Sequence, residues 1–153
     1  MSDVLVIEAS VAIKWLIAEE LSDKADTLLA DAQQRRMRLV APPLLFSEVT
    51  NGIYQRLRRR DIAISQAQRA LIWFYDLPIA PARIADLHPR SFEFARRHSL
   101  KSVYDAEYAI VALETRSPLW TADRAFFEAI PEELRRWMRW IGDVPEPGVP
   151  FRP

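Results

Sequence analysis

The chain of 153 residues has the length of one compact domain, and its 21 basic and 21 acidic residues leave a net charge of zero, which argues against a strongly basic nucleic-acid-binding coat. The absence of cysteine excludes disulfides, thiolate zinc sites and cysteine nucleophiles, and the presence of only three glycines excludes Gly-rich phosphate loops and dinucleotide fingerprints. The apolar runs are far shorter than the roughly 20 residues of a membrane helix, and the N-terminus lacks a signal-peptide pattern, so we expect a cytoplasmic protein.

The first part of the chain alternates short apolar runs with longer amphipathic segments. Val4–Ile7 is a β-branched run that predicts a strand buried on both faces, and Ser10 is placed to cap a helix over residues 11–18. A second helix is expected over residues 22–37 and a second strand over 38–41, closed by Pro42-Pro43. The long helix expected next has apolar residues at every fourth position, namely Leu45, Val49, Ile53 and Leu57.

The second part of the chain repeats this alternation. Helices are expected over residues 65–75, from just after the His88-Pro89 turn to about 98, over 102–115 and briefly from Asp123. Strands are expected at 79–80, 118–121 and, as a last edge strand, 138–141. Four prolines after residue 143 prevent regular packing. We therefore expect one domain over residues 1–143, followed by a proline-rich surface tail over 144–153.

Short buried strands that alternate with amphipathic helices predict an α/β sandwich with a mainly parallel sheet. In such folds, binding sites form beyond the carboxyl ends of the strands, where the helices begin. Any acidic residues at these junctions should therefore share one edge of the sheet.

Four acidic residues occupy such junctions: Glu8, Glu48, Asp105 and Asp123. Glu8 ends the first strand and Asp123 closely follows the 118–121 strand, while the other two lie near the starts of helices. Converging carboxylates would repel one another and raise one another's pKa, and a hard cation with oxygen ligands removes the conflict. We expect these residues to hold Mg²⁺ or Mn²⁺, either of which can generate a hydroxide and stabilise charge on a phosphate.

Each acid also has a structural interpretation. Glu48 and Asp123 could complement the positive end of a helix, Asp105 could form a capping box with Ser102, and Glu8 could pair with a nearby cation. The presence of an acidic residue at each of four junctions favours a shared metal site over four independent structural roles. Ser10 and Thr121 flank the site as candidates for holding carboxylates or water, and Asn51 shares a helix face with Glu48.

Four segments resemble PIN-domain ribonucleases of the VapC toxin type. Glu8-Ala-Ser-Val-Ala-Ile-Lys-Trp15 is similar to the family's opening motif, which has aspartate at the first position. The other matching segments are Pro43-Leu-Leu-Phe-Ser-Glu-Val-Thr-Asn51, Tyr104-Asp-Ala-Glu-Tyr108 and Thr121-Ala-Asp-Arg124. Their order and spacing agree across nearly the whole chain.

The resemblance implies a three-layer α/β/α PIN fold and Mg²⁺- or Mn²⁺-dependent hydrolysis of RNA phosphodiester bonds. It further implies a toxin that forms a homodimer and is blocked by a small antitoxin. Glu48, Asp105 and Asp123 then become the catalytic metal ligands, and Glu8 takes the place of the first aspartate. The apolar residues Trp15 and Leu16 are candidates for lining a dimer or antitoxin groove.

Glu8 departs from the family pattern because its side chain is one methylene longer, whereas Mg²⁺ requires near-ideal octahedral geometry. An alternative is therefore a degenerate PIN domain that binds RNA or a protein without cleavage. A phospho-acceptor receiver domain is disfavoured, since it needs an acidic pair after the first strand and a late lysine, and no lysine follows Lys101.

Overall fold

The computed structural model describes residues 3–146, apart from the side chain of Glu133. A five-stranded sheet lies at its centre in the order β3-β2-β1-β4-β5, and the four pairings between neighbouring strands are parallel. The strands are β1 (Val4–Ile7), β2 (Arg38–Ala41), β3 (Ile79–Pro81), β4 (Leu119–Thr121) and β5 (Met138–Trp140). The predicted parallel α/β fold is confirmed, and β5 is the edge strand expected near residue 138.

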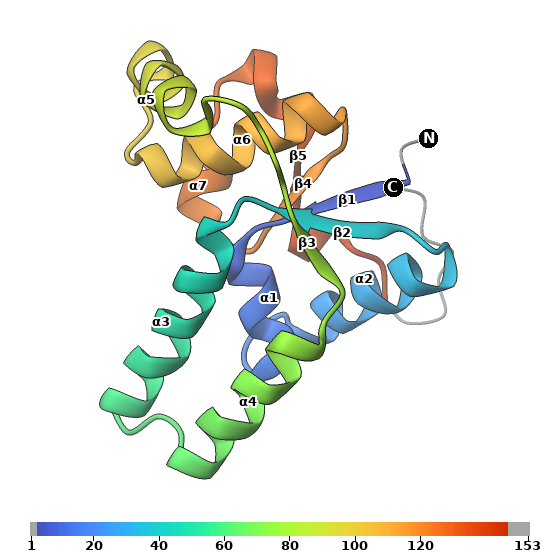
Figure 1. The fold of residues 1–153 in the computed structure, drawn as a ribbon. Helices are drawn as coiled ribbons and strands as arrows, with labels where there is room; N and C mark the ends of the chain where they lie inside the picture. Colours follow the sequence, from blue (N-terminus) through green and yellow to red (C-terminus); the bar gives the residue numbers. More distant parts are fainter. Residues whose placement is uncertain (1–2, 147–153) are drawn as a thin grey trace.

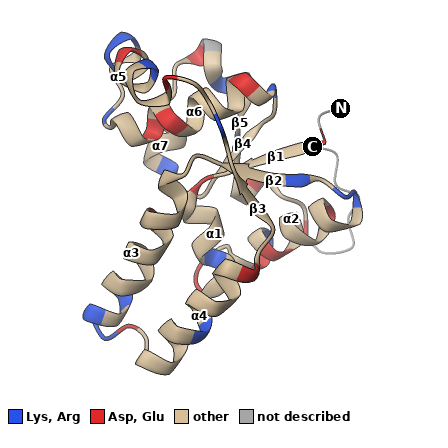
Figure 2. Ribbon diagram, viewed as in Figure 1, with Lys and Arg blue, Asp and Glu red and all other residues tan. Residues whose placement is uncertain are grey.

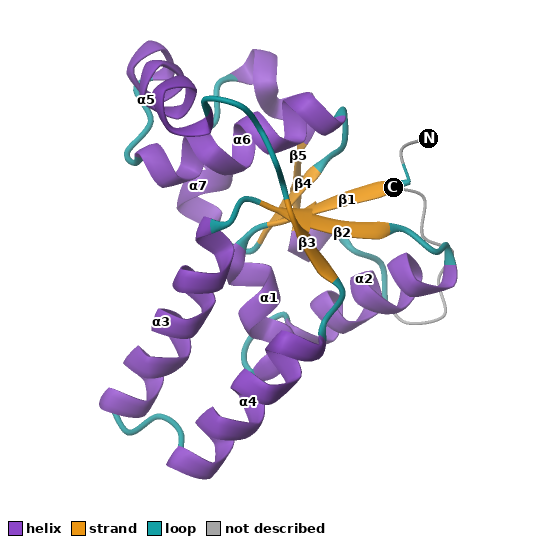
Figure 3. Ribbon diagram, viewed as in Figure 1, coloured by secondary structure: helices purple, strands orange, loops and turns teal. Residues whose placement is uncertain are grey.

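Helices cover both faces of the sheet, with α5 and α6 on one side and α1, α2 and α4 on the other (Figures 1 and 3). They are α1 (Ala9–Leu16), α2 (Ser22–Gln34), α3 (Leu44–Arg58), α4 (Ile64–Asp76), α5 (Leu87–His98), α6 (Val103–Thr115) and α7 (Arg124–Ala129). Two 3₁₀ helices, Glu132–Trp137 and Ile141–Asp143, flank β5 and were not predicted. This arrangement is the expected three-layer α/β/α sandwich.

The central strand is apolar because helices cover it on both faces. All four residues of β1 are buried, and Val6 lies opposite Val40 on one side and Leu119 on the other. The core extends into α6, whose residues 106–112 are all buried. Because α6 is enclosed by the core, its polar side chains are held in fixed positions.

Two residues set how α1 packs. Trp15 is a core residue, with its indole N–H donating to the carbonyl of Ala25 over 2.7 Å, so the suggestion that it lines a surface groove is wrong. Gly52 on α3 leaves room for Ile13, since a Cβ at that position would lie 2.5 Å from Ile13 Cδ1. Together these contacts hold α1 between α2 and α3.

Two predicted helix starts differ from the structure. Helix α1 begins at Ala9 with Glu8 as its N-cap residue, so Ser10 lies inside the first turn and is not the cap. Helix α5 begins at Leu87, so His88 and Pro89 belong to its first turn instead of a preceding one. Proline is tolerated there because the first amides of a helix have no acceptor within the helix.

The division into a domain over 1–143 and a tail over 144–153 stays a prediction. Val144 is buried and Glu146 pairs with Lys24 over 2.5 Å, which ties the first residues of the expected tail to the domain. Residues 147–153 lie outside the described part of the chain. Within residues 3–146 we find no helix with the length and apolarity needed to span a membrane.

Candidate active site at the carboxyl edge of the sheet

The predicted acidic residues sit where β1 and β4 end and α3 and α6 begin (Figure 1). Glu8 directly follows β1, and its backbone amide donates to the carbonyl of Trp120 in β4 over 3.1 Å. Asp123 is the N-cap residue of α7, Asp105 lies in the first turn of α6, and Glu48 lies in the second turn of α3. The parallel sheet therefore directs four separate chain segments to one edge.

Glu8 is held by two hydroxyl groups that both donate to its Oε2. One is Ser10 Oγ, and the other is Thr121 Oγ1 at 3.0 Å. Each hydroxyl in turn accepts a backbone amide, from Ala122 at 2.8 Å and from Asp123 at 2.9 Å. The loop after β4 is thus fixed to the carboxylate that ends β1.

The environment of Glu8 disfavours its charged form. Burial raises the pKa of this carboxyl from 4.5 to about 7, and the charge of Glu48 adds to the increase. The hydrogen bonds from Ser10 and Thr121 act in the opposite direction because they favour the carboxylate, but they only partly offset the burial. Near neutral pH, ionisation of Glu8 therefore lowers the free energy of unfolding.

Glu48 is hydrogen-bonded to the side chain of Tyr108. The Tyr108 hydroxyl donates to Glu48 Oε2 over 2.6 Å, a short bond of the kind that charged acceptors form. Burial raises the pKa of Glu48, and nearby Glu107 raises it further, while the bond from Tyr108 lowers it. For the phenol, burial and the neighbouring carboxylates raise the pKa, so Tyr108 stays a hydrogen-bond donor.

Asp105 is the residue that connects the other carboxylates electrostatically. Burial raises its pKa to about 6, with further increases from Asp123 and Glu48 and a smaller opposing effect from Lys101. Asp105 does not complete a capping box, since Ser102 caps α6 by accepting from the amide of Tyr104. Within its own helix, the charge of Asp105 therefore complements the helix dipole but does not take part in the cap.

Asp123 is exposed and does have a structural purpose. Its Oδ1 accepts the amide of Phe126 at 3.0 Å, so it caps α7 as the structural interpretation expected. It also lies close enough to Asp105 to raise the pKa of that residue. Capping and a place in the acidic cluster are compatible, and Figure 2 shows acidic positions gathered where α6 approaches α7.

Within residues 3–146, no three acidic or histidine side chains are already arranged to hold a metal ion. Two of the four carboxylates point to hydroxyl groups of the protein instead of to a common centre, since Glu8 accepts from Ser10 and Thr121 and Glu48 accepts from Tyr108. The donor set nevertheless suits a hard cation, since it consists of carboxylate oxygens whose mutual repulsion a cation would relieve. Rotation of the Glu8 and Glu48 side chains, without movement of the backbone, would turn their carboxylates toward such a cation.

The role predicted for Asn51 stays a prediction, and two further polar residues near the site, Tyr108 and Glu107, were missed. Asn51 is exposed, and its side-chain oxygen accepts from Gln55 one turn further along α3. Tyr108 and Glu107 were not singled out beyond the motif that contains them. The buried stripe of α6 could have indicated Tyr108, but an acidic residue that is 5% exposed, as Glu107 is, has no signature in a single sequence.

A parallel α/β/α sandwich with acidic residues at the ends of β1 and β4 and at the starts of α3 and α6 is the arrangement of a PIN domain. The PIN-domain family model matches residues 5–132, and the chain belongs to this family. The chain is also 28% identical over 129 residues to Ribonuclease VapC3 of Pyrobaculum aerophilum, an alignment that covers 83% of this chain and 95% of that protein. The resemblance inferred from the four motifs is thereby confirmed.

Proposed function

We propose that this protein is a Mg²⁺- or Mn²⁺-dependent endoribonuclease and the toxin of a toxin–antitoxin pair. The observation that carries the proposal is the electrostatic linkage of Asp105 to both Asp123 and Glu48 at the carboxyl edge of the sheet. Carboxylates that destabilise one another are retained where a cation compensates them. The ribonuclease name of the Pyrobaculum relative supports RNA as the substrate.

Some residues of the site would bind the cation, and others would orient the side chains that bind it. Glu48, Asp105 and Asp123 would hold the cation together with Glu8, and a bound Mg²⁺ or Mn²⁺ would supply a hydroxide nucleophile and neutralise charge on the phosphate. Tyr108 would orient Glu48, and Ser10 and Thr121 would orient Glu8, because each donates to the carboxylate concerned. Asn51 would contribute only after its side chain turns away from Gln55.

Cleavage of RNA with and without Mn²⁺ tests the proposal directly. We expect Asp105→Asn to abolish metal-dependent cleavage, because this change removes the carboxylate that links the cluster. The matched control is Asp61→Asn, which removes an exposed aspartate paired with Arg59 between α3 and α4. Equal cleavage by wild type and Asp105→Asn would refute the proposed site.

A second candidate is a PIN domain that binds RNA or a protein without cleavage. It is favoured by one observation, namely that Glu8 Oε2 accepts from both Ser10 and Thr121, so the longer side chain is engaged within the protein. Thermal unfolding with increasing Mn²⁺ separates the two candidates, because a ligand that binds only the folded state raises the melting temperature. No change in melting temperature would favour the non-catalytic protein.

We propose two protein partners, an antitoxin and a second copy of this chain. We also propose that the protein is cytoplasmic. A groove of about 540 Å³ between the end of α1 and helices α3 and α4 offers a place for an antitoxin segment, and Leu16 and Trp73 are among its lining residues. Coexpression with a candidate antitoxin, if a small reading frame overlaps the gene, followed by size-exclusion chromatography, would test both partners. Growth arrest that the second gene relieves would support the toxin assignment.

A further inference from the structure

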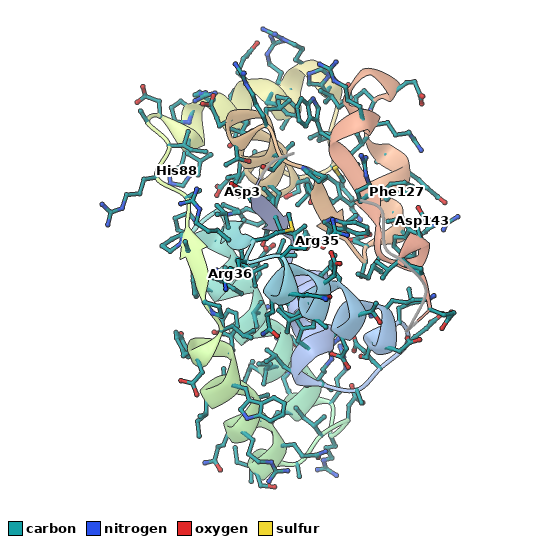
Figure 4. The ribbon with its side chains drawn as sticks, turned by 90° about the vertical axis from the view of Figure 1, so that its right-hand side faces the viewer. Asp3, Arg35, Arg36, His88, Phe127 and Asp143 are labelled. Carbon is teal, nitrogen blue, oxygen red and sulfur yellow. The ribbon has the colours of Figure 1, made fainter. Side chains whose placement is uncertain are left out.

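Two side chains beside the acidic cluster are exposed although their backbones are firmly held. Tyr104 precedes Asp105 in the first turn of α6, its amide donates to Ser102 Oγ at 3.0 Å, and the residue is 57% exposed. His88 is the second residue of α5, and its side chain is 82% exposed. Figure 4 shows His88 at the margin of the molecule.

Glu107 of α6 lies near both positions. His88 Nδ1 lies 3.1 Å from Glu107 Oε1, and Tyr104 precedes Glu107 by three residues, so their side chains lie on the same face of α6. Glu107 lies near enough to Glu48 to raise the pKa of that residue. A strip made of Tyr104, Glu107 and His88 therefore borders the proposed catalytic carboxylates, and we call it the α6 rim.

The chemistry of the α6 rim suits an unpaired nucleotide. An exposed aromatic ring can stack on a base, and a histidine that uses Nδ1 toward a carboxylate presents Nε2 on the opposite side of its ring. A protein of zero net charge whose site is lined with carboxylates has no strong general attraction for phosphates. Stacking supplies affinity that does not depend on charge, and it requires a base that is not already paired and stacked in a duplex.

We infer that Tyr104 stacks on an unpaired base next to the scissile phosphate and that His88, whose Nδ1 faces Glu107, accepts a hydrogen bond through Nε2 from the same nucleotide. This inference rests on the proposed function for its substrate class. It assigns substrate-binding roles to two residues outside the proposed metal ligands. The structural alternative for His88 is that it only pairs with the buried Glu107.

Binding measured without cleavage tests the inference separately from the nuclease activity. The probe is a short, fluorescently labelled, single-stranded RNA of randomised sequence, and its anisotropy is followed in the Asp105→Asn protein. Adding Tyr104→Ala should weaken binding about tenfold or more, since stacking on one base contributes about that much affinity. Tyr104→Phe should bind as before, and so should the control Tyr54→Ala, which removes an equally exposed tyrosine (56%) from α3.

His88→Ala should weaken binding several-fold with Tyr104 intact, whereas a residue that only pairs with Glu107 would alter the melting temperature and leave the RNA affinity unchanged. The same probe annealed into a duplex should show no dependence on Tyr104. Unchanged affinity in Tyr104→Ala, or no binding of the single strand at all, would overturn the inference. Loss of binding in Tyr104→Ala without any RNA cleavage by wild type would support the inference and contradict the nuclease proposal.

Discussion

Replacing Glu8 by glutamine should make the metal-free protein less sensitive to pH. Glutamine has the shape of protonated glutamic acid and keeps an oxygen that can accept from Thr121, but it carries no charge at any pH. Because burial raises the pKa of Glu8 in the folded state, ionisation of this residue opposes folding. The variant removes that opposition and little else.

The size of the effect follows from the pKa of about 7 in the folded protein against 4.5 in the unfolded chain. A difference of this size corresponds to about 3 kcal/mol of unfolding free energy, using about 1.4 kcal/mol per pKa unit. The folded state binds the proton more tightly, so this stability is fully present below pH 4.5 and is lost as the pH rises through 7. For a domain of this length, it corresponds to a change in melting temperature of about 6 to 12 °C.

Thermal unfolding in EDTA between pH 4.5 and 8.5 measures the effect. The melting temperature of wild type should fall relative to Glu8→Gln as the pH rises, and the difference should level off above pH 8. Glu20→Gln, which removes an exposed carboxylate near the end of the α1–α2 connection, controls for the change in net charge. Parallel curves for wild type and Glu8→Gln would refute the conclusion that Glu8 ionises against a desolvation cost.

Four further changes probe the rest of the site. Asp105→Asn should raise the melting temperature in EDTA by a few degrees, as it removes repulsion by Asp123 and Glu48; a lower value would contradict the electrostatic linkage. Tyr108→Phe should cost about 1.5 to 3 kcal/mol in urea unfolding, because Glu48 loses a charge-assisted bond. Thr121→Val should cost about 1 to 3 kcal/mol, since the Asp123 amide loses its acceptor and Glu8 a donor, whereas a neutral effect would contradict the linkage. Glu8→Asp should raise Mg²⁺-dependent RNA cleavage, and unchanged activity would show that side-chain length at this position does not limit catalysis.

The fold was predictable because its signals are local. The run Val4–Ile7 and the four-residue spacing of Leu45, Val49 and Ile53 depend only on near neighbours, and the structure confirms the strand and the long helix they indicate. The 3₁₀ segment over Glu132–Trp137 has no comparable periodicity and was not predicted. Helix starts were harder to predict, since Ser10 is by residue preference a better cap than Glu8, yet its hydroxyl donates to Glu8 and Glu8 takes the N-cap position.

The site was predictable only in part. Parallel topology brings strand ends to one edge, which placed Glu8 and Asp123 together with the helix-borne acids Glu48 and Asp105. The partners of these acids depend on side-chain directions, so the donation from Tyr108 to Glu48 and the pairing of His88 with Glu107 could not be derived from spacing. Such contacts join residues 60 and 19 positions apart in the chain.

The environment of Glu8 has two effects that act in opposite directions. Its Oε2 accepts from Ser10 and Thr121, which fixes the loop that carries Asp123, yet the carboxylate lies where burial raises its pKa. A cation bound at this edge would favour the ionised form of Glu8 and so recover part of the stability that ionisation costs. Metal binding should therefore stabilise the protein more at pH 8 than at pH 5.5, and this coupling is stronger for a desolvated glutamate than for an exposed aspartate.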